Sequence, residues 1–123
     1  MITNDEVIIE WFISPSPWKD HTEDFGGDWN GYAIVSKDHP DFGKDTDDVN
    51  LDVHGGVTYA APATNQRLDI PEKYRNENYW VFGFDTSHAG DKRWKWPKEK
   101  VEKEAAEMAS QLYVIQIKHM RGI

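Results

Sequence analysis

The sequence contains no cysteine among its 123 residues. This absence excludes a disulfide framework, a thiolate nucleophile and a cysteine-ligated zinc, so that a metal could be held only by His, Asp or Glu side chains. It also fits the reducing environment of the cytoplasm. Because a chain of this length usually forms one domain and can fold without cross-links, we expect a single domain over residues 1–123.

The chain also lacks a hydrophobic run long enough to cross a membrane. The apolar stretch Val7–Ile13 is short and is interrupted by Glu10, whereas a spanning helix needs about 20 apolar residues. Acidic residues, Asp5 and Glu6, precede it where a secretory signal would carry bases. We therefore expect a soluble, cytoplasmic protein that has no membrane partner.

Basic residues are scarce, with 14 Lys and Arg against 22 Asp and Glu and a net charge of −8. Residues 19–52 account for most of the net negative charge, because they carry ten acids and three lysines. A negative field repels phosphate backbones, so direct nucleic-acid binding is not expected unless a metal or a local basic patch intervenes. Cationic proteins or metal ions are better partners for such a surface, although the charge could also serve solubility alone.

Residues rich in β-branched and aromatic side chains predict the strands. We expect a first strand over residues 6–13, stopped by the prolines that follow, and a second strand that starts near Gly31, after an Asn30-Gly31 turn. Residues 51–59, divided by Gly55-Gly56, predict either a tight hairpin or one strand with a bulge. Residues 79–84 are apolar at every position, which is typical of a central strand covered on both faces.

The C-terminal segment predicts a helix. It begins near Pro97, which suits a first helical turn, and Gly122 stands just past its expected end. One apolar stripe recurs at spacings of three and four: Val101, Ala105, Met108, Leu112 and Ile115. Residues 113–117 would also suit a strand. The expected fold is therefore α+β, with a mainly antiparallel sheet of four or five strands packed against one C-terminal helix.

Two loops stand out for their composition. Residues 36–50 form a long acidic loop, of a length that is often functional, and Asp48 is a candidate ligand-binding residue there. This loop lacks the residue pattern of a calcium-binding loop. Residues 92–98 alternate bases with aromatics, as in some surfaces that bind single-stranded nucleic acid. Two tryptophans beside a proline more often pack against the following helix, and we favour that interpretation.

The candidate site combines the end of the 79–84 strand with residues 52–54. A strand pairing between the two would bring together two imidazoles and up to three carboxylates: Asp52, His54, Asp85, His88 and Asp91. Two chemistries follow. A divalent metal could be held by Asp52, His54, Asp85 and His88. Alternatively, His54 or His88 could act as a general base oriented by Asp85, with a ligand contacted by Thr86, Ser87 and Asp91.

A purely structural role for the same residues is an equally simple interpretation. Here the two histidines bond loop backbone, and the aspartates serve as turn or capping residues. Motifs that are specific for one chemistry are absent, since the sequence contains no phosphate-binding loop, no dinucleotide-binding glycine pattern and no nucleophile elbow. Nucleotide cofactors therefore have no support in the sequence.

Several short blocks within residues 29–112 resemble a family of small uncharacterised proteins of tailed phages and prophages. The blocks are Asn30-Gly31-Tyr32, His39-Pro40, Gly43-Lys44, Asp47-Asp48-Val49, the stretch 52–59 and the stretch 80–91. The family has no settled activity, so the resemblance implies a phage accessory role in an infected or lysogenic host. It also implies that the shared positions Asp52, His54, Asp85, His88 and Asp91 matter.

Two functional hypotheses follow. The first is a phage-type accessory protein whose His/Asp site binds a divalent metal or a small polar ligand, with or without hydrolysis of that ligand. The second is a non-enzymatic acidic protein that inhibits a basic host factor through the loop of residues 38–52. The residues do not decide whether the protein is an enzyme.

Overall fold

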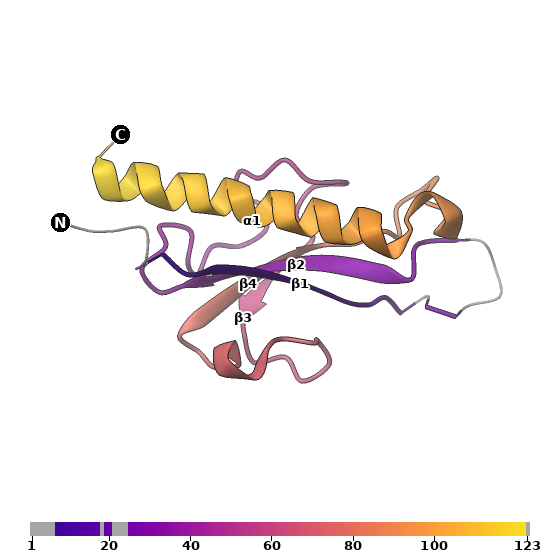
Figure 1. The fold of residues 1–123 in the computed structure, drawn as a ribbon, viewed down its shortest axis with the longest axis horizontal. Coiled ribbons are helices and arrows are strands. Elements are labelled where there is room, and N and C mark those ends of the chain that lie inside the picture. The colour runs from indigo at the N-terminus through magenta and orange to yellow at the C-terminus, as the bar shows by residue number, and fades with distance from the viewer. Residues whose placement is uncertain (1–6, 18, 21–24, 123) are drawn as a thin grey trace.

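The computed structural model describes residues 7–17, 19–20 and 25–122, and a four-stranded antiparallel sheet lies at its centre (Figure 1). The strands are β1 (Ile9–Pro15), β2 (Trp29–Ser36), β3 (Tyr59–Pro62) and β4 (Tyr79–Phe84), in the order β1-β2-β4-β3. The first strand thus starts and ends later than predicted, and Glu6 lies outside the described residues. Strand β4 lies inside the sheet between β2 and β3, which confirms the prediction of a central strand.

Helix α1 (Lys98–Arg121) lies along one face of this sheet (Figure 1). The predicted apolar stripe is buried as far as Leu112, and the helix continues for more than two further turns, so the alternative strand at residues 113–117 is wrong. Gly122 ends the helix in the left-handed conformation, with φ at 71°, and its N–H bonds the carbonyls of Lys118 and His119. The predicted α+β class, an antiparallel sheet packed against one C-terminal helix, is confirmed.

Residues 63–75 cover the opposite face of the sheet (Figure 1). They include a short 3-10 helix, η2 (Glu72–Tyr74). Arg75 fixes the segment by donating to the carbonyls of Asn65, Leu68 and Ile70 at 2.9–3.0 Å. The sheet therefore has a hydrophobic cluster on each face, and the apolar character of β4 at every position is explained.

The turn predicted at Asn30-Gly31 is wrong, because both residues lie inside β2. Gly31 is opposite Phe84 in the sheet, and a Cβ on Gly31 would lie 2.4 Å from the Phe84 ring. The glycine therefore makes room for an aromatic neighbour. The Asn30 side chain accepts a hydrogen bond from the N–H of Thr86 at 3.1 Å, which ties β2 to the chain that follows β4.

The prediction for residues 51–59 is also wrong, because the strand begins only at Tyr59. Residues 51–58 lie in an irregular segment with a turn at His54-Gly55. Burial nevertheless alternates along its first residues, since Leu51 and Val53 are buried and Asp52 is exposed. The physical reason is that the backbone N–H groups of Asp52 and His54 bond side chains of α1, and the segment reaches β4 at Thr58, whose N–H donates to the carbonyl of Gly83 at 2.9 Å.

Both outer strands of the sheet end in proline, β1 at Pro15 and β3 at Pro62. The N–H of Ser16 donates to the carbonyl of Asp28, so the backbone N–H and C=O groups of even-numbered residues point from β1 toward β2. The backbone nitrogen of Pro15 therefore points away from β2. The bond from Ala63 to Tyr79 places Pro62 outward in the same way. Both prolines therefore occupy positions where no partner strand needs their missing N–H.

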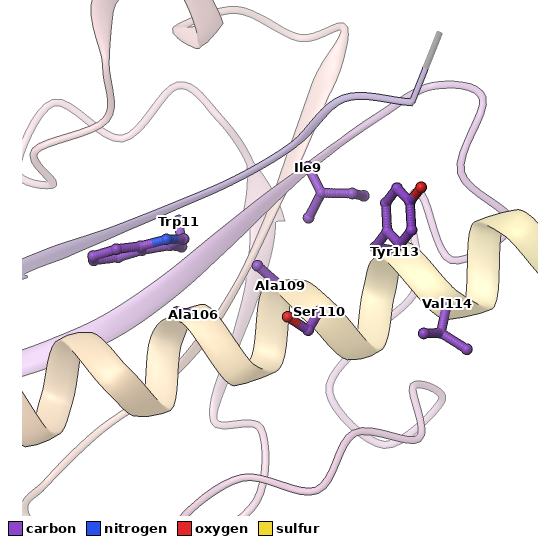
Figure 2. Close-up of a pocket in the computed structure, with 7 residues that line it drawn as sticks. All are labelled: Ile9, Trp11, Ala106, Ala109, Ser110, Tyr113 and Val114. Carbon is purple, nitrogen blue, oxygen red and sulfur yellow. The ribbon is translucent and has the colours of Figure 1, made fainter. Parts of the chain in front are cut away.

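An open groove of about 390 Å³ runs between the outer side of β1 and α1 (Figure 2). Ile9 and Trp11 line it from the strand, and small residues of the helix, Ala106, Ala109 and Ser110, leave it open. In the ranges that the structure describes, no helix has both the length and the apolar character of a membrane span.

Candidate functional site

The irregular segment of residues 37–58, called here the long loop, is fastened to α1 near its start by His39. The buried imidazole accepts a hydrogen bond at Nδ1 from the N–H of Asp41, at 2.9 Å. Nε2 must therefore carry the hydrogen, which it donates to the carbonyl of Leu112 at 2.8 Å. Burial lowers the pKa of His39 below its ordinary value, so the neutral ring is the form that the fold holds.

Two further residues of α1 fasten the end of the long loop. Gln111 accepts from the N–H of Asp52 at 2.7 Å and donates to the carbonyl of Asp52 at 2.8 Å. Glu104 accepts from the N–H of His54 at 2.8 Å. Positions 104 and 111 are seven residues apart, about two helical turns, so their side chains lie on one face of α1. This face positions the His54 side chain.

His54 is joined to Asp91, which comes from the loop after β4. Its Nε2 lies 3.0 and 3.1 Å from the two carboxylate oxygens of Asp91. One of these oxygens also accepts from the N–H of His88 at 2.8 Å. Burial by itself would raise the pKa of the Asp91 carboxyl, but the hydrogen bonds from His54 and His88 outweigh it and lower the pKa below its ordinary value. Since Asp91 is ionised, Nε2 of His54 carries a hydrogen, and in the neutral ring the lone pair is therefore on Nδ1.

His88 completes the cluster beside Asp85 and Gly55. Its Nε2 lies 3.2 Å from a carboxylate oxygen of Asp85, yet this buried nitrogen makes no hydrogen bond within the described part of the chain. We therefore treat the Asp85 contact as electrostatic. The imidazole edge lies against Gly55, where an added Cβ would be 2.1 Å from Nε2. Gly55 has a φ of 70°, so both its conformation and its missing side chain are required here.

Trp96 lies against the cluster. Its ring centroid is 4.2 Å from that of His54, and the His54 and His88 centroids are 5.4 Å apart. Of the two tryptophans expected to pack against the helix, Trp96 is buried, with 7% of its surface exposed, whereas Trp94 is 70% exposed. Sequence reasoning missed both Gly55 and Trp96 as parts of the site. The Gly55-Gly56 pair was the available signal for the first.

The remaining predicted site residues have other surroundings. Thr86 is fully buried, and its hydroxyl donates to the carbonyl of Trp29 at 2.8 Å, so it supports the loop. Ser87 donates its N–H to Asp85 at 3.0 Å in a local turn. Asp52 is exposed and contributes backbone bonds to α1, and Asp48 lies in an exposed turn of the long loop. The structure thus brings together His54, Asp85, His88 and Asp91.

Within the described ranges, no group of three or more His, Asp and Glu side chains is arranged to hold a metal ion. Comparisons of the chain with protein-family models, with curated proteins and with solved structures found no match.

Proposed function

We propose that the His54–Asp91 pair is the centre of a site for a small polar ligand, in a phage-type accessory protein that hydrolyses this ligand. The observation that carries the proposal is the contact of both Asp91 carboxylate oxygens with His54 Nε2. An ionised carboxylate bonded to one ring nitrogen fixes the tautomer and leaves the other nitrogen as a base.

The roles of the residues follow from this geometry. Asp91 orients the His54 ring and favours its protonated form during proton transfer, and Nδ1 of His54 accepts a proton from water or from the ligand. Trp96 restricts the ring from one side. Asp85 and His88 supply charge and polarity beside the base. A divalent metal would require these side chains to rearrange, since they form no three-donor group, so we propose the metal-free form.

Hydrolysis of a panel of activated esters, both carboxylic and phosphoric, tests the proposal. General acid–base catalysis contributes about 10²–10⁴-fold, so we expect His54→Gln to reduce kcat/KM by at least about 100-fold. Asp91→Asn should reduce it less, because the base remains. His119→Gln, at the exposed end of α1, is the matched control.

Metal dependence is measured in the same assays, with Mn²⁺, Zn²⁺, Mg²⁺ or Ca²⁺ added and with thermal shifts recorded for each ion. Activity that needs an added metal would replace the metal-free form of the proposal by the metal form. Absence of hydrolysis across the panel, or activity equal in His54→Gln and wild type, would refute a catalytic role.

The long loop favours a second candidate, a non-enzymatic acidic protein that binds a basic host factor. Asp45, Asp47 and Asp48 are exposed on a segment that His39 and Gln111 hold against α1. A fixed acidic surface loses little conformational entropy when it binds a cationic partner. Capture of basic host proteins at low salt, abolished when the three aspartates are changed to Asn and unchanged in His54→Gln, would support this candidate. Equal capture by both variants would refute it.

A further inference from the structure

A basic aromatic patch lies at the N-terminal end of α1, beside the short turn η3 (Arg93–Lys95), which is orange in Figure 1. Residues 92–100 carry five bases and one acid, a net charge of +4. Since the net charge of the whole chain is −8, the rest of the chain carries a net charge of −12. We define the patch as the exposed Lys92, Trp94, Lys95 and Lys98 together with Lys19 and Trp29.

The geometry of η3 explains why Trp94 is exposed. In a 3-10 helix, residues three apart lie on the same side. Arg93 and Trp96, the residue that follows η3, both point inward: Arg93 pairs with Asp28 at 2.7 Å, and Trp96 is buried against His54. Trp94 consequently faces solvent, with 70% of its surface exposed. An exposed indole of this size is uncommon on a protein surface, since burying it is strongly favourable.

Lysine ammonium groups surround the aromatic rings of the patch. The Lys95 Nζ lies 5.3 Å from the centroid of the Trp94 ring, and Lys98 and Lys19 lie 5.1 and 5.5 Å from that of Trp29. These contacts hold ammonium groups beside flat apolar surfaces. The Lys19 ammonium is also paired with the Asp20 carboxylate at 3.1 Å, so Lys95 and Lys98 supply the positive charge beside the two rings. The combination of stacking surfaces and cations is what single-stranded nucleic acids use when they bind proteins without sequence preference.

The acidity of the long loop does not cancel this local charge. The loop is attached to α1 at Leu112, Gln111 and Glu104, and the acidic loop residue among these attachments, Asp52, bonds Gln111, thirteen residues after Lys98 and about 20 Å along the helix. The Debye length at 0.1 M salt is about 10 Å, so most of that negative field is screened at the patch. The net negative charge of the chain argues against nucleic-acid binding except at a local basic patch. Residues 92–98 form such a patch.

We propose that the basic aromatic patch binds single-stranded nucleic acid, with a base stacked on Trp94 and with phosphates contacted by Lys92, Lys95 and Lys98. A duplex would not use Trp94, because its bases are already stacked. The proposal is independent of the function proposed for His54.

The test is the fluorescence anisotropy of a labelled oligothymidylate of about 15 nucleotides, measured with the full chain from 50 to 200 mM salt. We expect Trp94→Ala to weaken binding by about tenfold, since stacking of one base contributes about 1–3 kcal/mol. Lys95→Gln with Lys98→Gln should reduce the slope of log K against log salt by about 1.4, at about 0.7 for each lost phosphate contact.

The control is Lys103→Gln with Lys118→Gln, which makes the same change in net charge at exposed positions of α1 outside the patch. Equal losses in the two double variants would show a general charge effect and overturn the proposal. Undetectable binding at 50 mM salt would overturn it as well, as would binding of a duplex as tight as that of the single strand. Binding of anionic phospholipid vesicles but not of the oligonucleotide would assign the patch to a membrane surface instead.

Discussion

The long loop and the segment of residues 85–97 both bring side chains to the candidate site, but they are fixed in different ways. The long loop depends on distant partners: His39 bonds the carbonyl of Leu112, and Asp52 bonds Gln111. The 85–97 segment combines a local turn, closed by the bond from the His88 N–H to Asp91, with ties to the chain around the start of β2, from Thr86 to Trp29 and from Arg93 to Asp28. A single change in a distant partner should therefore detach the long loop, whereas the other segment should keep its local turn.

Replacing His39 should have the largest effect on the attachment of the long loop to α1. His39→Ala would leave the Leu112 carbonyl and the Asp41 N–H without their partner and open a cavity in a buried position. We expect a loss of about 2–4 kcal/mol in the free energy of unfolding, measured by urea denaturation. His119→Ala, at an exposed position of the same helix, should change it by less than about 0.5 kcal/mol. A similar, small effect of both variants would show that His39 does not fasten the loop.

The contact between the long loop and the 85–97 segment, at Gly55 and His88, can be tested by changing two adjacent glycines. Gly55 and Gly56 both have left-handed backbones, with φ of 70° and 80°. Only Gly55 lies against His88, and a Cβ on Gly56 would meet nothing within 4 Å. Gly56→Ala should cost about 1 kcal/mol of stability, from the backbone alone. Gly55→Ala should cost about 1–2 kcal/mol more and should shift the NMR signals of the His88 ring. Equal costs would mean that His88 is not packed on Gly55.

The pH dependence of unfolding is the mildest test, since it changes no residue. The folded state lowers the pKa of His39 below 6.5, so the unfolded chain binds the proton first as the pH falls. The stabilisation from neutral His39 is complete above about pH 6.5 and is lost as the pH falls through the lower, folded pKa, at up to about 1.4 kcal/mol per pH unit. His39→Ala should lack this slope. Asp91, whose pKa is lowered below 3.8, should add a second loss only in stronger acid.

The parts of the fold that follow from local periodicity could be predicted from the sequence. The 3.6-residue stripe of Val101, Ala105 and Met108 identified α1, and the continuous apolar run identified β4 as an inner strand. The Asn30-Gly31 pair misled because its glycine is needed for the Phe84 ring and not for a turn. Such a packing requirement depends on a strand more than 50 residues away, which no local pattern reveals.

The candidate site was predicted in part. The grouping of His54 with Asp85, His88 and Asp91 was expected from a strand pairing, and the structure assembles it through a helix instead. The polar side chains of Glu104 and Gln111 that do this resemble ordinary surface residues in the sequence. The exposure of Trp94 could not be predicted either, because no local pattern in the sequence distinguishes the tryptophan that points outward from the one that points inward.

The outward prolines at the ends of β1 and β3 bear on self-assembly. An outer strand offers free backbone donors and acceptors to any other extended chain, including a copy of itself, and ordered stacking of such strands leads to fibrils. Pro15 and Pro62 each remove one donor from the two exposed margins of the sheet. Because both margins carry this block, a continuous row of hydrogen bonds cannot extend along the full length of either one. Each proline thereby shortens the part of its margin that another strand can pair with.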